Sequence, residues 1–284
     1  MTTPKATRCG GSEFVWGSRT YVMGIINATP DSFSGDGLAY NVDAAVEQGK
    51  RFLVEGADIL DVGGESTRPA STPVSVEEEF RRVIPVVERL AREPGAVISI
   101  DTYKAGVAER ALDAGASMLN DVWGLKHDPA LAELASRRGV PIVLMHNQSG
   151  TEYKNLLADL LTSLRLSVEG ALKAGVSREN IIIDPGIGFG KTAEHNLEVL
   201  RRLEDLQTLG QPLLVGTSRK STIGLVLDLP VEERLEGTAA TVALAIAKGA
   251  DIVRVHDVKA MVRVCRMADA IVRGWSRREG GRTR

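Results

Sequence analysis

A repeated unit of about 33 residues constrains the fold of this chain most strongly, because one strand and one helix with their connections need about that length. Each unit opens with a short run rich in valine, isoleucine and leucine, passes through a helical stretch and ends near a glycine. Eight such runs predict eight strands, over residues 21–27, 57–64, 96–102, 117–122, 141–146, 180–186, 212–218 and 251–258.

The eight runs are continuously apolar, as expected for parallel strands that are covered on both faces. Segments 42–55 and 76–90 repeat apolar residues at helical spacing, and segment 232–248 passes from charged to alanine-rich. Glycine follows several predicted helices directly, at positions 56, 115, 139 and 249, where it is a common stop signal. Eight strand-then-helix units predict an α/β fold of the (β/α)8 TIM barrel type, with an open doubly wound sheet as the competing arrangement.

The same count bears on the number of domains. A chain of 284 residues allows two domains of average size, but one barrel often uses this length. We therefore expect a single barrel domain over residues 1–284, with residues 1–12 and 277–284 frayed. A small N-terminal hairpin over residues 13–21, with Gly17 and Ser18 in its turn, is expected to close the bottom of the barrel.

Composition excludes several classes of protein. Lys plus Arg number 35 and Asp plus Glu 37, so a net charge of −2 argues against a broad cationic surface and a nucleic-acid partner. The two cysteines, Cys9 and Cys265, have neither disulfide-framework nor zinc-site spacing. Neither a secretion signal nor an apolar run of about 18 residues is present, so we expect a soluble cytoplasmic protein without a membrane partner.

Polar residues stand at the carboxyl end of every predicted strand, which is where barrel enzymes build their active sites. One such residue alone is explained as a strand cap or a structural ion pair, whereas eight polar ends together indicate a shared pocket. The residues concerned are Asn27, Asp61, Glu65, Asp101, Asn120, Asp121, His146, Asp184, Ser218, Arg219, Lys220, Arg254 and His256.

The types of side chain at these ends indicate what the pocket binds. Lys220, Arg254 and His256 belong to the seventh and eighth units, where barrels often bind phosphate, and Arg68 after the second strand is a further candidate. The carboxylates of Asp101 and Asp184 can each accept two parallel bonds from an amino group and a neighbouring ring N–H. The sequence therefore predicts a flat heterocycle at one end of the pocket and an anionic group at the other.

Residues 186–192 (GIGFGKT) resemble a phosphate-binding P-loop, but the motif requires glycine at position 185, which is Pro185. We expect these glycines to let the backbone approach a flat ligand closely, with Phe189 either beside that ligand or in the core. His127 and His195 are expected to be structural or surface groups, and Cys265 to be buried packing.

Seven motifs follow one another along the predicted strand ends and their loops. The first two are 23–34 (MGIINATPDSFS) and 61–69 (DVGGESTRP). The others are 99–102 (SIDT), 120–122 (NDV), 184–186 (DPG), 218–221 (SRKS) and 254–258 (RVHDV). In this order they resemble the motifs of dihydropteroate synthases, and the resemblance covers roughly residues 14–275. Two loops depart from the family pattern. Residues 34–37 read SGDG where many members have SDGG, and residues 145–151 read MHNQSGT where many have His-Met followed by Arg-Gly.

The resemblance implies a transferase of folate biosynthesis. Such an enzyme condenses 6-hydroxymethyl-7,8-dihydropterin diphosphate with 4-aminobenzoate, and it releases diphosphate and 7,8-dihydropteroate. The resemblance also implies Mg²⁺ as cofactor and a homodimer formed through late helices, such as residues 239–248 and 259–273.

The resemblance further assigns site residues by position. It places the pterin against Asp101, Asn120, Met145, Asp184, Phe189, Gly216 and Lys220. It places the diphosphate against Asn27, Thr67, Arg68, Arg254 and His256, with Mg²⁺ bound through Asn27. It places the aminobenzoate against Phe33, Thr67, Pro69, Lys220 and Ser221.

The implied reaction is a dissociative, SN1-like substitution without a covalent nucleophile. Asp31, Arg68 and Lys220 are the implied catalytic residues. Mg²⁺ and the cations stabilise the leaving diphosphate, while Asp101 and Asp184 stabilise the pterin cation. Two alternatives stay open from the sequence: a methyltetrahydrofolate-dependent methyltransferase that acts with a corrinoid partner, and a non-catalytic pterin-binding paralogue.

Overall fold

The computed structural model describes residues 3–29, 41–65 and 73–275. Within these ranges, eight parallel strands form one sheet in the order β8-β7-β6-β5-β4-β3-β10-β9. A parallel bridge between Ile183 and Leu213 joins the two ends of this order, so the sheet closes into the predicted barrel. The strands are β3 (Tyr21–Asn27), β4 (Ile59–Gly63), β5 (Ile98–Asp101), β6 (Met118–Asp121), β7 (Ile142–Met145), β8 (Ile181–Asp184), β9 (Leu214–Val215) and β10 (Ile252–Val255).

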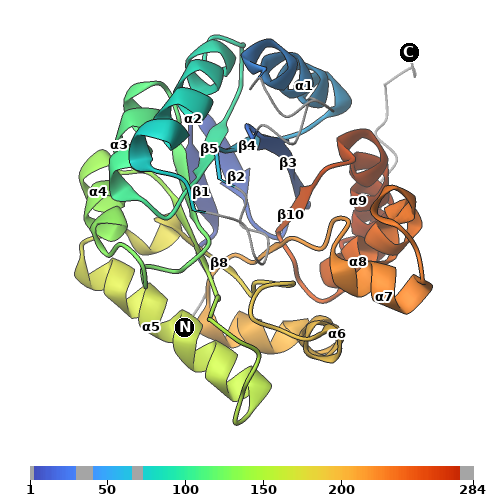
Figure 1. Cartoon of the computed structure of the whole chain (residues 1–284). Coiled ribbons are helices and arrows are strands. Elements are labelled where there is room, and N and C mark those ends of the chain that lie inside the picture. The colour runs from blue at the N-terminus through green and yellow to red at the C-terminus, as the bar shows by residue number, and fades with distance from the viewer. Residues whose placement is uncertain (1–2, 30–40, 66–72, 276–284) are drawn as a thin grey trace.

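Helices surround the strands as a ring (Figure 1). They are α1 (Val42–Glu55), α2 (Val76–Leu90), α3 (Ala105–Asp113), α4 (Ala130–Arg138), α5 (Leu156–Lys173), α6 (Ala193–Arg201), α7 (Ser221–Leu227), α8 (Leu235–Ala247) and α9 (Val258–Val272). Short 3-10 turns lie at η2 (Arg178–Asn180), η3 (Leu203–Leu209) and η4 (Val231–Glu233). Helices α1 and α2 have the predicted bounds, whereas the helix expected over residues 232–248 is divided into η4 and α8.

Local chemistry explains where the helices begin and end. The side chain of Asn41 accepts a hydrogen bond from the backbone N–H of Ala44 at the start of α1, and Ser75 caps α2 in the same way. The glycines at positions 56, 115, 139 and 249 all have positive φ, between 64° and 113°. The predicted glycine stops are therefore confirmed, because this backbone conformation ends a helix and is easiest for glycine.

The N-terminal hairpin closes the bottom of the barrel as predicted, but it lies earlier in the chain. It consists of β1 (Ala6–Cys9) and β2 (Ser12–Val15), paired antiparallel around Gly10 and Gly11. The expected hairpin over residues 13–21 is thus wrong, and so is the expectation that residues 6–12 are frayed. Both turn glycines have positive φ, 55° and 79°, which a tight hairpin turn of this kind requires.

Aromatic residues from the hairpin region pack against the first inward-facing side chains of the barrel strands. Phe14 and Trp16 contact Tyr21 edge to face, with ring centroids 4.9 and 5.5 Å apart. They belong to a cluster that also holds Cys9, Met23, Ile59, Val97, Met118, Val143, Ile182, Leu214 and Ile252. This end of the barrel is filled with apolar groups, so polar chemistry is left to the opposite end.

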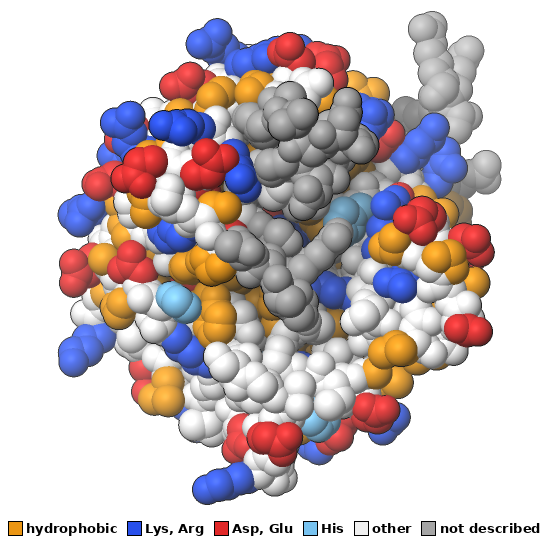
Figure 2. Space-filling view, in the orientation of Figure 1, with side chains coloured by type: hydrophobic (Ala, Val, Ile, Leu, Met, Phe, Trp, Pro, Cys, Tyr) orange, Lys and Arg blue, Asp and Glu red, His pale blue; other side chains and the backbone are white. Residues whose placement is uncertain are grey.

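The outer surface agrees with the charge arithmetic. Figure 2 shows positive and negative side chains interspersed around one face of the molecule. None of the helices within the described ranges combines the length and the apolar character that crossing a bilayer requires.

Candidate active site

Four polar side chains are deeply buried at or near the carboxyl ends of four barrel strands. Asp61 of β4, Asp101 of β5, Asn120 of β6 and Asp184 of β8 are at most 7% exposed. Register explains part of this convergence, since Asp101 is paired with Gly63 on one side and with Asn120 on the other. Polar groups in such a position need partners, and their partners define the site.

Arg254 of β10 lies between two of these carboxylates. Its Nε donates to Asp61 Oδ2 and its Nη2 to Asp101 Oδ2, both at 2.6 Å. Burial disfavours the charge of Arg254, but attraction to Asp61 and Asp101 outweighs burial and raises its pKa above the ordinary value. The expected separation of cations from carboxylates is therefore wrong for Arg254, because this cation neutralises the buried acids.

Asp61 belongs to this group of residues, although the sequence predicts no specific role for it. Its Oδ2 accepts from both Arg254 and the Asn120 side-chain amide, the latter at 2.9 Å. It therefore sets the position of two predicted ligand contacts. The available signal was an aspartate in the middle of the apolar run ILDVG, where a carboxylate is costly unless it is paired.

Two buried oxygens in this cluster accept no hydrogen bond within the described part of the chain. They are Asp61 Oδ1 and Asp101 Oδ1. Burial raises the pKa of Asp101 to about 7, although Arg254 opposes that rise. Buried acceptors of this kind favour a ligand that brings N–H donors.

Asp184 is held from its own loop. Its Oδ1 accepts from the backbone N–H of Gly186 at 2.7 Å. Burial raises the pKa of Asp184 to about 6, and this hydrogen bond together with Lys220 and Arg254 limits the rise. The second predicted carboxylate is thus held in a fixed orientation.

Lys220 and Phe189 form a further part of the site. The Lys220 ammonium lies 4.0 Å from the centroid of the Phe189 ring, a cation–π contact. A side chain at Gly188 would approach Lys220 Cδ to 2.8 Å, so glycine leaves room for this lysine. Met145 is buried at the end of β7, while a Cβ at Gly216 would make only an ordinary contact with Arg254, at 3.7 Å.

His256 does not supply the positive charge that the sequence predicted. Burial, with Arg254 and Arg219 nearby, lowers the pKa of His256 to about 3, so the ring is neutral. Its Nδ1 lies 3.0 Å from Ser218 Oγ, which ties β10 to the end of β9. Arg219 makes a second tie through two bonds to Asp257, at 2.6 and 2.9 Å.

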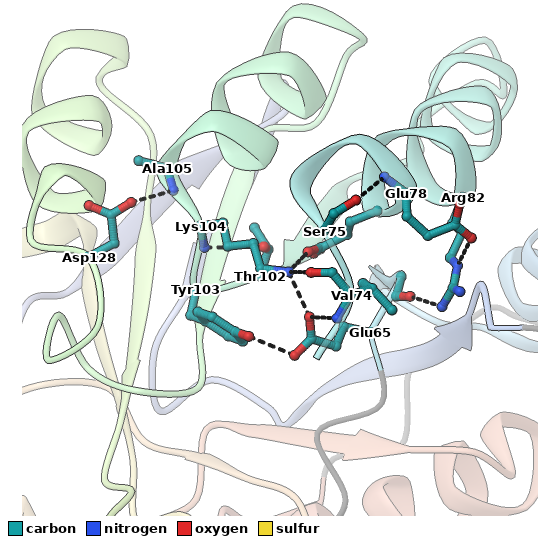
Figure 3. Close-up of polar contacts among 12 residues, drawn as sticks. Glu65, Val74, Ser75, Glu78, Arg82, Thr102, Tyr103, Lys104, Ala105 and Asp128 are labelled. Carbon is teal, nitrogen blue, oxygen red and sulfur yellow. Dashed lines mark hydrogen bonds and ion pairs between the residues drawn. The ribbon is translucent and has the colours of Figure 1, made fainter. Parts of the chain in front are cut away.

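A buried ion cluster holds the ends of the segment between β4 and α2 (Figure 3). Lys104 Nζ donates to Glu65 and Glu79 carboxylates at 2.6 Å and to the Val74 carbonyl at 2.7 Å. Glu65 also accepts from the Tyr103 hydroxyl at 2.7 Å. This cluster joins the regions on both sides of residues 66–72.

The described residues fit Mg²⁺ only as an ion held mainly by substrate. No group of three or more His, Cys, Asp or Glu side chains in residues 3–29, 41–65 and 73–275 is arranged to hold a metal ion. Asn27 ends β3 partly exposed, and its amide oxygen is of the hard type that Mg²⁺ accepts. Mg²⁺ usually keeps several waters and takes substrate phosphate oxygens with only a few protein ligands, so Asn27 could complete such a set.

Several predicted residues lie outside the described residues. They are Asp31, Phe33, Thr67, Arg68 and Pro69, together with the variant motif at residues 34–37. Ser221 is described and exposed, as the first residue of α7.

Three predicted structural roles are confirmed. His195 completes a capping box with Thr192 at the start of α6, and His127 packs edge to face on Trp123. Cys265 is buried in α9.

Comparison with known proteins connects this geometry to a family. The pterin binding enzyme family matches residues 23–256. A dihydropteroate synthase of Clostridium beijerinckii is 54% identical over 267 residues, which is 94% of this chain and 99% of that protein. The crystal structure of a Clostridium difficile dihydropteroate synthase with pteroic acid has a TM-score of 0.88 at 52% identity, covering 91% of this chain and 98% of that one. A Xanthomonas albilineans dihydropteroate synthase with 4-aminobenzoic acid has a TM-score of 0.90 at 42% identity, covering 95% and 98%.

Proposed function

The chain belongs to the dihydropteroate synthase family of folate-biosynthesis transferases, and we propose that its barrel mouth carries out the family's reaction. The reaction joins 4-aminobenzoate to 6-hydroxymethyl-7,8-dihydropterin diphosphate, with loss of diphosphate. The observation that carries the assignment is the buried polar group formed by Asp61, Asp101, Asn120 and Asp184. Two of its carboxylate oxygens, Asp61 Oδ1 and Asp101 Oδ1, can accept hydrogen bonds from a ligand.

In this proposal the pterin ring lies among these groups. Asp101 and Asp184 accept hydrogen bonds from its amino and ring N–H groups, and Asn120 contacts the same edge, held by Asp61. Met145 and Phe189 cover the ring faces, and Gly216 lies beside Arg254. Lys220 contacts the ring from its place against Phe189.

The diphosphate is assigned to the β10 side of the pocket. The Arg254 guanidinium has five N–H donors, and Asp61 and Asp101 account for two of them, so it can serve carboxylates and phosphate oxygens together. His256, being neutral, offers a hydrogen bond rather than charge. Asn27, Thr67 and Arg68 complete this set, and Asn27 would hold Mg²⁺. The ion, when bound, offsets negative charge that builds on the leaving group.

The aminobenzoate is assigned to Phe33, Thr67, Pro69, Lys220 and Ser221. When the bond between the pterin methylene and the diphosphate oxygen breaks, its electron pair leaves with diphosphate. The resulting cation is stabilised by the carboxylates Asp101 and Asp184, with Asp31 from the first loop. The aryl amine then forms the new C–N bond, and its proton passes to diphosphate or water.

Three further properties are part of the proposal. The whole chain forms one barrel domain, which the single closed sheet supports. The protein acts in the cytoplasm, in keeping with two buried, unpaired thiols, Cys9 and Cys265. It forms a homodimer through α8 and α9, on which Leu244, Met267 and Ile271 are at least 62% exposed.

A diphosphate-release assay with dihydropterin diphosphate and magnesium tests the activity. Release that depends on 4-aminobenzoate, with dihydropteroate formed, is the expected result. Pterin binding without turnover would contradict the proposal and favour a non-catalytic paralogue. Lys220→Ala should lower kcat by roughly 100-fold or more, as expected for a group that touches both substrates. Lys248→Ala, whose lysine pairs with Glu204 at the surface, is the matched control and should keep full activity.

A further inference from the structure

The lysine of the P-loop look-alike has a different use in the structure. Lys191 is only 9% exposed, and its ammonium lies inside the loop that follows β8. It donates to His146 Nδ1 at 2.9 Å and to the carbonyls of Gly186 and Phe189 at 3.1 Å each. An ammonium has three N–H donors, and these three acceptors use all of them, so Lys191 is not available for a phosphate.

The acceptor on His146 connects this loop to the neighbouring strand. Burial, with Lys191 and Lys126 nearby, lowers the pKa of His146 to about 3. The ring is therefore neutral, and its Nδ1 can accept a hydrogen bond from the Lys191 ammonium. The backbone N–H of His146 donates to the carbonyl of Asp184 at 2.9 Å. Lys191 and His146 therefore join the end of β7 to both the beginning and the middle of the loop after β8.

The two residues whose carbonyls Lys191 binds each contact a residue that is assigned to the pterin. Gly186 orients the Asp184 carboxylate through its N–H. Phe189 supports the Lys220 ammonium. The Lys191 ammonium thus fixes the position of the backbone at both Gly186 and Phe189.

Close packing leaves this loop little freedom once it is held. A Cβ at Gly186 would collide with the His146 carbonyl oxygen, and φ there is +68°. A Cβ at Gly190 would lie 2.6 Å from the Gln148 carbonyl oxygen. The Tyr153 hydroxyl donates to the Gly190 carbonyl at 2.7 Å. The loop is pressed onto the segment after β7, and Lys191 fills its interior.

We propose that Lys191 is a positioning residue for the pterin half of the site, acting through the Gly186 and Phe189 carbonyls on Asp184 and Lys220. The inference rests on the proposed function, because it uses the pterin assignment of Asp184 and Lys220. It adds a residue that contacts neither substrate. It also explains why a buried cation is kept in the loop despite the cost of burying it.

The positive charge of Lys191 gives a second measurable effect, on the pH dependence of pterin binding. A residue that only held the loop in place would not change this pH dependence. Charged groups that act on Asp184 are Lys220, Arg254 and Lys191, and each lowers the pKa of its carboxyl. Burial lowers the pKa of Lys191 itself to about 7, so it is mostly charged at pH 6, where Asp184 titrates. Removing that charge should therefore move the acid limb of pterin binding toward neutral pH.

Lys191→Met tests the proposal in the full-length protein. The expected results are a rise of about tenfold in KM for dihydropterin diphosphate, little change in KM for 4-aminobenzoate, and an acid limb shifted upward by roughly half a pH unit or more. Lys173→Met is the control, because it removes a lysine that is exposed at the end of α5. It should change either KM less than twofold.

Lys191→Gln separates position from charge and serves if the methionine variant fails to fold. Its amide keeps two donors for the carbonyls, so KM should rise less than threefold while the acid limb still shifts. Unchanged pterin KM and an unmoved acid limb in a folded variant would overturn the proposal. Activity of the unaltered protein in the same assay tests the proposed function separately.

Discussion

Arg254 Nη2 and Asp101 Oδ2 lie 2.6 Å apart, so the cation proposed for diphosphate rests on a carboxylate proposed for the pterin. The two halves of the site are therefore linked through one ion pair. Asp101 Oδ1 accepts no other bond in the described residues, so a pterin N–H can bind this carboxylate while Arg254 keeps Oδ2 and directs its remaining donors to phosphate oxygens.

Replacing Arg254 by methionine should lower the free energy of unfolding by about 3–5 kcal/mol at pH 7.5, because two buried carboxylates lose their partner. Urea denaturation measures this loss, and the loss should shrink at pH 5 as Asp101 protonates. Arg263→Met is the control, because it makes the same substitution at an exposed position and should change the free energy of unfolding little. A loss below about 1 kcal/mol for Arg254→Met would show that the pair is not stabilising the fold.

Pterin affinity should rise with pH between about 5.5 and 8, because Asp101 and Asp184 accept N–H bonds best as carboxylates. Burial raises their pKa values to about 7 and about 6. Isothermal titration with a dihydropterin across this range measures the effect. The dependence should flatten in Asp184→Asn, and a flat profile in the unaltered protein would count against the assignment.

The same two acids should affect stability in the opposite direction. Their folded pKa values exceed the unfolded value, so the folded protein binds more protons between about pH 4 and 7. Their contribution to the free energy of unfolding is present at low pH and is lost as pH rises through that window. Asp184→Asn should therefore remove part of this fall in urea midpoint, which a pH series of denaturation curves would detect.

Lys104→Met should destabilise the fold by roughly 3 kcal/mol, since it leaves Glu79, which is 1% exposed, and Glu65 without their cation. Lys50→Met is a matched control: it also removes a lysine that pairs with two glutamates, but at the surface. Exposed pairs of this kind contribute little to stability, because water screens them. Equal losses in the two variants, measured by urea unfolding, would contradict the importance of burial here.

Ile271→Glu should convert the proposed dimer to monomer, because it puts a charge on an exposed apolar position of α9. Size-exclusion chromatography with light scattering measures the mass directly. Val54→Glu, at an 89% exposed position of α1, is the control and should leave the oligomeric state unchanged. A monomeric unaltered protein would refute the dimer.

Periodicity predicted the barrel because each strand and helix is set by a local pattern. The hairpin was misplaced because two turn signals compete near the N-terminus, at Gly10-Gly11 and at Gly17-Ser18. Only the first stands between segments that pair, β1 and β2. Which strands pair depends on how the flanking segments pack, and a turn signal alone does not determine that.

The sequence predicts site residues one by one but not the network that joins them. Asp101, Asn120 and Asp184 follow from the pattern, because each stands at or near the carboxyl end of a strand. The Arg254 ion pairs and the neutral state of His256 depend on side chains that meet across the barrel. Separations of 153 and 193 residues carry no local signature of such contacts.

The joining of β3 to β10 has a consequence for the order in which the protein can fold during synthesis. Val22 pairs with Val253, and Thr20 donates to Asp269, 249 residues later. The first barrel strand therefore keeps its β10 edge unpaired until β10, which is made much later, has left the ribosome. Closing so long a loop is slow, so the unpaired edge of β3 stays open to wrong pairing while the strands between β3 and β10 form.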